Sequence, residues 1–247
     1  MNKLSVILPC YNEKQLLKQN SLKLLNFLNQ QNYSFDWKIV LLLNGTTDDS
    51  KPIAIELKEQ YNKITVFIVE EKGKGNAIKK YFDYSSADFL IYMDIDLAVD
   101  IKNINDLISP LLNNNYDLVI GSRLLKESTT NRSAIRELSS HVYIFLSKLI
   151  LKHSLSDLQC GFKGIKKEAF KKISPFIQDK FWFFDTELLI FAILLNRTIK
   201  EIPVDWSENR YEKRKSKIKI IKNSLDFIKN LLQLKKRLKA VKNNKSF

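Results

Sequence analysis

The amino-acid sequence predicts an α/β protein with a mostly parallel central sheet flanked by helices, followed by a basic amphipathic helix at the C-terminus. Apolar runs rich in β-branched residues alternate with segments of helical spacing from residue 4 to residue 120. This alternation is typical of β–α–β units, whose strands lie parallel and whose helices cover both faces of the sheet. The chain has 247 residues, of which 45% are apolar, so it is long enough to bury a substantial core.

Five strands are expected from short apolar runs bounded by polar or turn-forming residues. The first run, LSVIL, leads into Pro9 and a polar segment rather than a small-residue cleavage site, so it is interpreted as a strand and not as a signal peptide. The other runs, WKIVLLL, ITVFIV, FLIYM and LVI, combine branched and aromatic residues in the same way. In chain order, the expected strands are residues 4–8, 37–43, 64–69, 89–93 and 118–120.

Between these strands, apolar residues recur every three or four positions, as they do in amphipathic helices. The expected helices are residues 15–27, 53–61, 77–84 and 104–112. From Tyr211 to Phe247, thirteen basic residues accompany only two acidic ones, so most of the net charge of +14 lies there. We therefore expect a globular domain in residues 1–210 and a basic amphipathic tail in residues 211–247. Such a tail can bind anionic lipid or nucleic acid, or it can pack against its own domain or a partner helix.

Several classes of protein are excluded by composition. Cys10 and Cys160 are too few and too far apart for a disulfide framework or a metal cluster, so a reduced, cytoplasmic setting is expected. His141 and His153 have no zinc-binding context. The longest apolar runs are interrupted by charged residues, so no membrane-spanning helix is expected.

Polar, charged or glycine-bearing segments follow the expected strands: PCYNE, NGTTDDS, EKGKGNA, DIDLAVD and GSR. In open parallel sheets, ligands bind beyond the carboxyl ends of the strands. Asp94 and Asp96 lie two positions apart after a buried strand, and paired carboxylates suit a hard cation such as Mg²⁺ or Mn²⁺ that also takes phosphate oxygens. Lys72 and Lys74 flank Gly73 just before a helix, where an anion is favoured. The edge of the sheet is therefore predicted to bind a cation and a diphosphate.

The segments SVILPCYNE, NGTTDDS, KGKGNAI, DID, GSR, DLQCGFK and WFFDTELL resemble, in order, the motifs of family 2 glycosyltransferases with the GT-A fold. The resemblance spans residues 3–218 and is closest to the dolichyl-phosphate glucosyltransferase and dolichyl-phosphate mannose synthase branch. It implies an inverting, metal-dependent transferase that moves a hexose from a UDP- or GDP-hexose to a polyprenyl (dolichyl) phosphate. It also implies Mg²⁺ or Mn²⁺ as cofactor and a peripheral location at the cytoplasmic, anionic face of a membrane, where a membrane protein could act as scaffold.

The resemblance assigns roles to individual residues. Asp94, Asp96 and Arg123 are implied to be catalytic, and the two aspartates to be the metal ligands. The implied donor-binding residues are Pro9, Tyr11, Asn12, Glu13, Asn44, Lys74, Asp94, Ile95, Asp96 and Arg210. The implied acceptor-binding residues are Arg123, Arg136, Ser140 and Lys217.

The sequence departs from the family pattern at two places. Leu43 and Asn44 stand where the family usually has paired aspartates after the second strand, and Ala98 stands where mannose synthases of this type carry glutamine. The second departure is closer to the glucosyltransferase pattern. The sugar and the nucleotide base therefore stay open.

The need for a catalytic base depends on the acceptor. A phosphate monoester is already ionised at neutral pH, whereas a hydroxyl acceptor needs a carboxylate base, for which Asp157, Asp185 and Glu187 are the candidates; the last two could equally be structural. The basic tail and the apolar segment HVYIFLSKLILK favour a lipid acceptor.

Three alternatives to that function remain at the level of sequence. The first is a transferase acting on a hydroxyl group of a glycan or cell-surface polysaccharide. The second is a nucleotidyltransferase, which also needs aspartates and a metal. The third is a noncatalytic basic protein that binds nucleic acid or membrane. Because Phe227 and Phe247 are the only aromatic residues of the helical tail after residue 211, base stacking is poorly supported and no nucleic-acid partner is expected.

Overall fold

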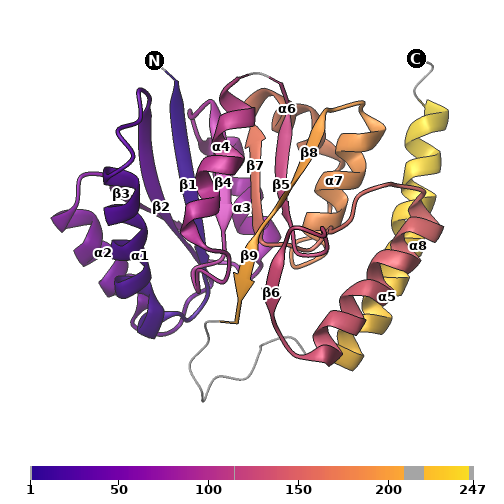
Figure 1. Cartoon of the computed structure of the whole chain (residues 1–247), viewed down its shortest axis with the longest axis horizontal. Coiled ribbons are helices and arrows are strands. Elements are labelled where there is room, and N and C mark those ends of the chain that lie inside the picture. The colour runs from indigo at the N-terminus through magenta and orange to yellow at the C-terminus, as the bar shows by residue number, and fades with distance from the viewer. Residues whose placement is uncertain (1, 114, 209–219, 245–247) are drawn as a thin grey trace.

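The computed structural model describes residues 2–113, 115–208 and 220–244, with side chains from residue 227 to residue 243 in the last segment. The described chain forms a sheet between two layers of helices (Figure 1). Among these residues, the sheet has seven strands in the order β3-β2-β1-β4-β7-β5-β8. The expected fold class, a mostly parallel α/β sheet flanked by helices, is confirmed.

Six of the strands are parallel, and the inner ones have the apolar sequences of strands that are buried on both faces. They are β1 (Lys3–Cys10), β2 (Asp36–Asn44), β3 (Ile64–Val69), β4 (Phe89–Met93), β5 (Leu118–Ser122) and β8 (Ile199–Pro203). The strand β7 (Phe162–Lys166) is antiparallel to both of its neighbours, β4 and β5. The five expected strands are all present: two match the expected bounds, two are longer by two residues, and the first is longer by three.

One helical layer covers each face of the sheet. The helices α1 (Lys14–Asn29), α2 (Ser50–Gln60) and α4 (Ile104–Leu112) contribute to one core, and α3 (Lys74–Tyr84), α6 (Lys167–Ile173) and α7 (Phe184–Leu194) contribute to the other. All four expected helices are present. The helix α3 begins three residues earlier than expected, so Lys74 lies in its first turn and not in the preceding loop.

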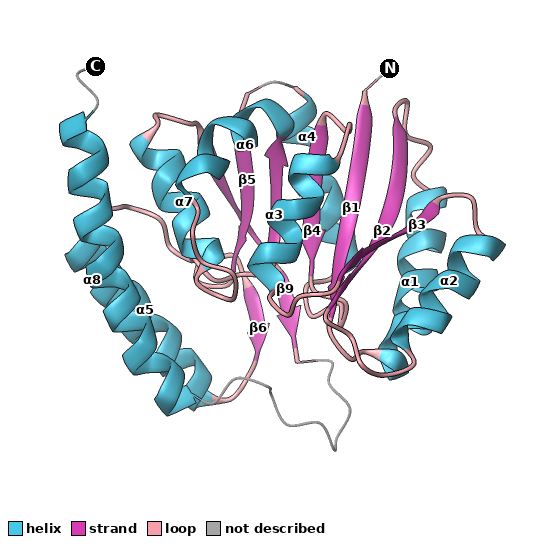
Figure 2. Cartoon of the chain, turned by 180° about the vertical axis from the view of Figure 1, so that it is seen from behind, coloured by secondary structure: helices cyan, strands magenta, loops and turns pink. Residues whose placement is uncertain are grey.

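Two further pairs of elements lie at the margins of the sheet. The short strands β6 (Thr129–Asn131) and β9 (Asp205–Ser207) pair with each other. The helices α5 (Ala134–Leu151) and α8 (Ile220–Asn244) lie side by side at the edge of the molecule (Figure 2). None of the described helices is long and apolar enough to cross a membrane.

The basic C-terminal helix packs on the rest of the chain. Leu231 and Leu234 are fully buried in the core that α3, α6 and α7 share, and the Phe227 ring contacts that of Tyr143 on α5 at 5.1 Å. This part of the helix therefore packs against its own domain, which is one of the outcomes that the sequence analysis expected for the tail. The boundary expected at residue 210 lies outside the described residues and stays a prediction.

Candidate active site

The carboxyl ends of β1, β2, β4 and β5 open into a cavity of about 810 Å³. This is the edge of the sheet at which the sequence predicted a ligand. The cavity brings together eleven of the predicted site residues: Pro9, Tyr11, Glu13, Asn44, Lys74, Asp94, Ile95, Asp96, Arg123, Arg136 and Ser140. Arg210 and Lys217 lie outside the described residues.

Asn12 differs from its predicted place, because it is not among the residues that line the cavity. Its backbone adopts a left-handed conformation, with φ of 55°. Its amide accepts a hydrogen bond from the Thr47 backbone N–H at 2.8 Å and donates one to the Thr47 hydroxyl at 3.1 Å. Asn12 therefore joins the loops that follow β1 and β2.

Asp94 and Asp96 lie on a tight turn at the end of β4. The Leu97 backbone N–H donates to the Asp94 carbonyl at 3.0 Å, and Leu97 adopts a left-handed φ of 49°. The Asp96 carboxylate accepts a hydrogen bond from the Ala98 backbone N–H at 3.2 Å. A Cβ atom at Gly161 would collide with the Asp94 carboxylate. The turn and this close approach fix both carboxylates at the cavity wall.

Lys74 compensates the charge of Asp94. The Lys74 Nζ lies 2.6 Å from Asp94 Oδ1, and the lysine side chain is only 9% exposed. Burial opposes the charged form of Lys74, but attraction to Asp94, Asp185 and Asp96 outweighs it and raises the pKa of Lys74. The same Nζ lies 5.2 Å from the Trp182 ring centre, which adds a cation–π contact. The ammonium group is therefore charged and fixed beside the aspartate pair.

The chemistry of the aspartate pair fits a hard divalent cation that is shared with a phosphate group. Two carboxylates are available, and among the described residues no cluster of three or more His, Cys, Asp or Glu could enclose a metal ion. Mg²⁺ and Mn²⁺ commonly take one or two carboxylates and complete their shell with water and phosphate oxygens. The residues therefore fit a metal ion that binds together with a diphosphate, and they do not fit a metal ion enclosed by protein ligands alone.

Arg123 follows β5 at another part of the cavity wall. Its Nε and Nη2 donate to the two oxygens of Asp157 at 2.7 and 3.0 Å, a bidentate pair that is largely buried. Burial alone would raise the pKa of Asp157, but the charge and hydrogen bonds of Arg123 lower it to about 2. Arg123 is thus held in a buried pair, and not in the surface ion pair that is the commonest structural role of an arginine.

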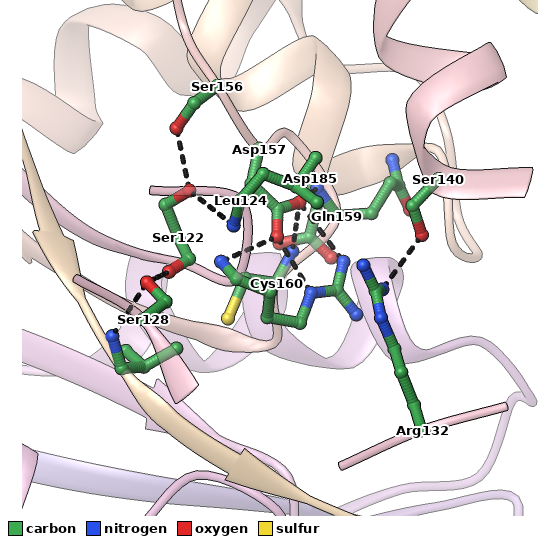
Figure 3. Close-up of polar contacts among 12 residues, drawn as sticks. Ser122, Leu124, Ser128, Arg132, Ser140, Ser156, Asp157, Gln159, Cys160 and Asp185 are labelled. Atoms are coloured by element: carbon green, nitrogen blue, oxygen red, sulfur yellow. Dashed lines mark hydrogen bonds and ion pairs between the residues drawn. The ribbon is translucent and has the colours of Figure 1, made fainter. Parts of the chain in front are cut away.

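A second layer of hydrogen bonds surrounds Asp157, whose backbone N–H donates to Glu201 at 3.3 Å; Figure 3 shows the part that joins Ser156 to Ser122. Glu201 on β8 accepts from the Ser156 backbone N–H at 2.8 Å and from the Ser156 hydroxyl at 2.6 Å. The Ser156 and Ser122 hydroxyls lie 2.6 Å apart. Sequence reasoning missed Ser156 and Glu201, because they lie in segments far from Arg123 in the chain and have no motif of their own.

Arg136 and Ser140, which were predicted to bind the same acceptor, have different side-chain partners. Arg136 forms an ion pair with Glu208. The Ser140 hydroxyl donates to the Arg136 backbone carbonyl at 3.0 Å and accepts from Arg132 Nη1 at 3.0 Å. Arg132, which the sequence analysis did not single out, also lines the cavity.

Asp185 and Glu187, two of the three candidate bases, have structural roles. Asp185 accepts from Lys163 Nζ at 2.8 Å and from the Tyr92 hydroxyl, and it is 2% exposed. Glu187 accepts from the backbone N–H groups of Gln178 and Asp179 at 2.6 and 2.8 Å. Neither carboxylate lines the cavity. Asp157 does line it, but its low pKa makes it a weak base.

The rim of the cavity is apolar where α5 passes. Ile135 and Leu138 line the cavity and are 70% and 66% exposed, and Phe145 and Leu149 extend this exposed face along the helix. Phe181, in the loop before α7, is 55% exposed and also lines the cavity. The cavity is therefore polar at the aspartate turn and apolar at its α5 rim.

An α/β sheet of this topology, with an Asp-x-Asp turn and a lysine at a cavity beyond its strand ends, defines a glycosyltransferase of the GT-A type. A protein-family model described as "Glycosyl transferase family 2" matches residues 5–174. The chain belongs to glycosyl transferase family 2, within its dolichyl-phosphate glycosyltransferase branch. The family resemblance of the sequence motifs is thereby confirmed.

Individual relatives agree with this assignment. The chain is 31% identical over 245 residues to a dolichyl-phosphate beta-glucosyltransferase of Saccharomyces cerevisiae, a match that covers 91% of this chain and 73% of the relative. It is 30% identical over 203 residues to glycosyltransferase AglD of Haloferax volcanii, covering 82% of this chain but only 32% of that protein. This chain thus corresponds to about a third of the length of AglD.

Solved structures agree with the fold. Glucosyl-3-phosphoglycerate synthase from Mycobacterium tuberculosis, crystallised with uridine diphosphate, matches with a TM-score of 0.67 over 96% of this chain and 80% of that one. The two sequences are 20% identical. This likeness supports the GT-A fold expected from the motifs.

Proposed function

We propose that this protein transfers a hexose, with inversion, from a UDP- or GDP-hexose to a polyprenyl phosphate at the cytoplasmic face of a membrane. The observation that carries the proposal is the composition of one cavity: an aspartate pair with a lysine, then arginines, then the exposed apolar side chains of α5. The names of the relatives, dolichyl-phosphate beta-glucosyltransferases, support the same acceptor class.

The aspartate turn is proposed to hold the donor diphosphate. A Mg²⁺ or Mn²⁺ ion on Asp94 and Asp96 would supply positive charge to the diphosphate as it leaves. Lys74 orients Asp94 and adds a fixed positive charge beside it. The mycobacterial synthase was crystallised with Mn²⁺ and uridine diphosphate, which supports this cofactor class.

The nucleotide is proposed to bind where β1 and β2 end. Pro9, Tyr11, Glu13 and Asn44 line that part of the cavity. Lys72 Nζ lies 5.3 Å from the Tyr11 ring centre, which forms a cation–π contact in this part of the cavity. The residues named here leave the choice between uracil and guanine open.

The acceptor phosphate is proposed to bind near Arg123. A phosphate monoester carries its own negative oxygen, so the reaction needs orientation of the acceptor more than removal of a proton. This agrees with the environments of Asp157, Asp185 and Glu187, whose carboxylates are all committed to other groups. The Asp157 pair fixes the direction of the Arg123 guanidinium.

The prenyl chain is proposed to leave the cavity over α5. The exposed apolar side chains of α5 and the basic residues of α8 lie on neighbouring helices, and this combination favours the surface of an anionic membrane. In this arrangement residues 1–210 form the transferase domain, and residues 211–247 form a basic tail whose Leu231 and Leu234 pack into the core of that domain. A membrane protein could contribute a scaffold at the same surface.

The proposal is tested by incubating the protein with radiolabelled UDP- and GDP-hexoses, Mg²⁺ or Mn²⁺, and a polyprenyl phosphate. Label should pass into the organic phase, and Asp96→Ala should abolish that product. Asp106→Asn, which removes one exposed carboxylate of α4 away from the cavity, should leave it unchanged. Full activity of Asp96→Ala would count against the site, and label on a hydroxyl of a glycan would favour the alternative acceptor.

A further inference from the structure

Arg237 joins the C-terminal helix α8 to α7. The two helices are in contact (Figure 1), and between them the Arg237 guanidinium forms an ion pair with Glu187 and donates a hydrogen bond to the Phe176 backbone carbonyl. The guanidinium carbon also lies 5.3 Å from the Phe191 ring centre, which adds a cation–π contact. The Glu187 side chain is only 3% exposed, and among the residues that the structure describes Arg237 is the cation that pairs with it. Because a buried carboxylate without a partner is costly, this pair couples the two helices.

Glu187 also holds the loop of residues 177–183, which leads into α7. Its Oε2 accepts hydrogen bonds from the backbone N–H groups of Gln178 and Asp179 at 2.6 and 2.8 Å, whereas its Oε1 accepts from Arg237. Asp179 Oδ1 in turn accepts from two backbone N–H groups farther along the chain, at 2.7 and 3.0 Å. One buried carboxylate therefore links α8 to the backbone of the 177–183 loop.

The 177–183 loop packs closely on the first turn of α3. The carbonyl oxygens of Lys180 and Phe181 accept hydrogen bonds from two backbone N–H groups of this turn, at 3.0 and 3.2 Å. A Cβ atom at Gly73 would collide with the Lys180 carbonyl oxygen, and one at Gly75 would lie 2.9 Å from the Phe181 carbonyl oxygen, so both glycines permit the approach. The loop thus engages two of the N–H groups at which the sequence analysis expected an anion.

The same loop forms the cavity wall beside the aspartate turn. Phe181 and Trp182 both line the cavity. Lys74 Nζ lies 5.2 Å from the Trp182 ring centre and 2.6 Å from Asp94 Oδ1. The loop therefore contacts Lys74 in two ways, through the backbone of the first turn of α3 and through the Trp182 ring. A displaced loop would shift the Lys74 ammonium group relative to Asp94.

We infer that Arg237 and Glu187 are positioning residues for the donor site, because they fix the 177–183 loop, and through it Lys74, in the arrangement that binds the nucleotide diphosphate. Neither residue lines the cavity, so both act through the loop. The inference rests on the donor part of the proposed function and adds the C-terminal helix to it. Leu231 and Leu234 already anchor α8 in the core, whereas the Arg237 pair connects the helix to the cavity wall.

The test compares Arg237→Gln with the matched control Arg197→Gln. Arg197 also pairs with a carboxylate, that of Asp117 at 3.9 Å, and donates to a backbone carbonyl, but it lies between α7 and β8 and outside the cavity. UDP and GDP, each with Mn²⁺, are titrated into the full chain by calorimetry, and the nucleotide that the wild type binds more tightly is the probe. Arg237→Gln should weaken its binding by about 3- to 30-fold, the range for coupling through packed side chains, and Arg237→Lys should recover part of the loss. Arg197→Gln should stay within about twofold of the wild type.

Further measurements separate positioning from a general loss of stability. Glu187→Gln should also weaken nucleotide binding, and the double variant Glu187→Gln/Arg237→Gln should bind no more weakly than the weaker single variant, because both substitutions act through one contact. Hydrogen–deuterium exchange of Arg237→Gln should become faster in peptides that contain residues 73–84 and 177–183, and it should stay unchanged in β1. In the transfer assay, the KM for the donor should rise and the KM for the acceptor should stay unchanged.

Unchanged nucleotide binding in Arg237→Gln would overturn the inference, and so would additive losses in the double variant or an equal loss in Arg197→Gln. Faster exchange over the whole chain of Arg237→Gln would assign the pair to stability alone. The failure of the proposed function is distinguishable. If the wild type binds neither nucleotide, the proposed donor site fails, and the exchange pattern alone decides whether Arg237 positions the loop. If the wild type transfers sugar and Arg237→Gln keeps the same donor KM, the inference fails and the function stands.

Discussion

Replacing Asp157 by asparagine should destabilise the protein in a manner that depends on pH. The carboxylate is 2% exposed and accepts two hydrogen bonds from Arg123. The pKa of Asp157 falls from 3.8 to about 2 in the folded protein. One pKa unit corresponds to about 1.4 kcal/mol, so this drop represents about 2 to 3 kcal/mol of folding free energy at neutral pH. For a chain of this length, the loss should lower Tm by roughly 5 to 10 °C.

The sign of the pH dependence follows from the direction of the pKa change. Because the folded pKa of Asp157 lies below its unfolded value, the stabilisation is fully present above about pH 4 and is lost as the pH falls toward 2. Urea unfolding of the wild type and of Asp157→Asn, followed by tryptophan fluorescence, should therefore show a difference that is largest at neutral pH and shrinks below pH 4.

Asp36→Asn is a matched control for this experiment. Asp36 also pairs with a cation, Lys63, but its side chain is 56% exposed, so its removal should cost less than about 1 kcal/mol. A wild-type-like unfolding free energy for Asp157→Asn at pH 7 would refute the reasoning. A difference that does not change between pH 5 and pH 2 would refute the assignment to ionisation.

Three other substitutions test separate parts of the structure. Leu234→Ala should reduce the free energy of unfolding by about 2 to 5 kcal/mol, measured by urea titration, because Leu234 is fully buried. Leu232 is 49% exposed, so Leu232→Ala should cost less than about 1 kcal/mol in the same titration. Equal effects of the two substitutions would contradict the packing of α8. Lys74→Met should raise the KM for the nucleotide sugar by roughly 10-fold or more, because Asp94 loses its ion-pair partner. The far-UV circular dichroism spectrum should stay unchanged. An unchanged KM would exclude a role of Lys74 in donor binding. Phe145→Ser should reduce flotation of the protein with anionic vesicles without lowering Tm, because Phe145 is 67% exposed on α5. Flotation equal to that of the wild type would argue against the exposed face of α5 as the membrane contact.

The point substitution at Phe145 is also a cleaner test of membrane binding than deletion of residues 219–247. The deletion would remove Leu231 and Leu234 from the core, so it would unfold part of the domain as well as remove charge. The substitution changes only an exposed side chain.

The sequence was sufficient to predict the first five strands and their helices, because each has a clear periodic pattern. The aspartate turn was predictable for the same reason: it follows the fully buried strand β4, and the alternation places it at the carboxyl ends of the parallel strands. The strand β7 was not predicted. Its sequence, FKGIK, contains two lysines, and the burial of Lys163 is understandable only from its pairing with Asp185, 22 residues later.

The acceptor side was less predictable, because its residues depend on long-range contacts. Arg123 was found from its motif, but Glu201 and Ser156, which fix Asp157 behind it, come from separate segments. Arg132 has no motif either. It reaches the cavity wall only because the segment between β6 and α5 is folded against it.

The central claim is that one cavity holds a nucleotide diphosphate at the aspartate turn and an acceptor phosphate at the arginines. A crystal structure of the protein with Mn²⁺, a non-transferable UDP-hexose analogue and geranyl phosphate tests it most directly. We predict that the diphosphate will contact the ion on Asp94 and Asp96, and that the geranyl phosphate will contact Arg123 with its chain over α5. A diphosphate bound away from the two aspartates, or a geranyl phosphate bound outside this cavity, would contradict the account.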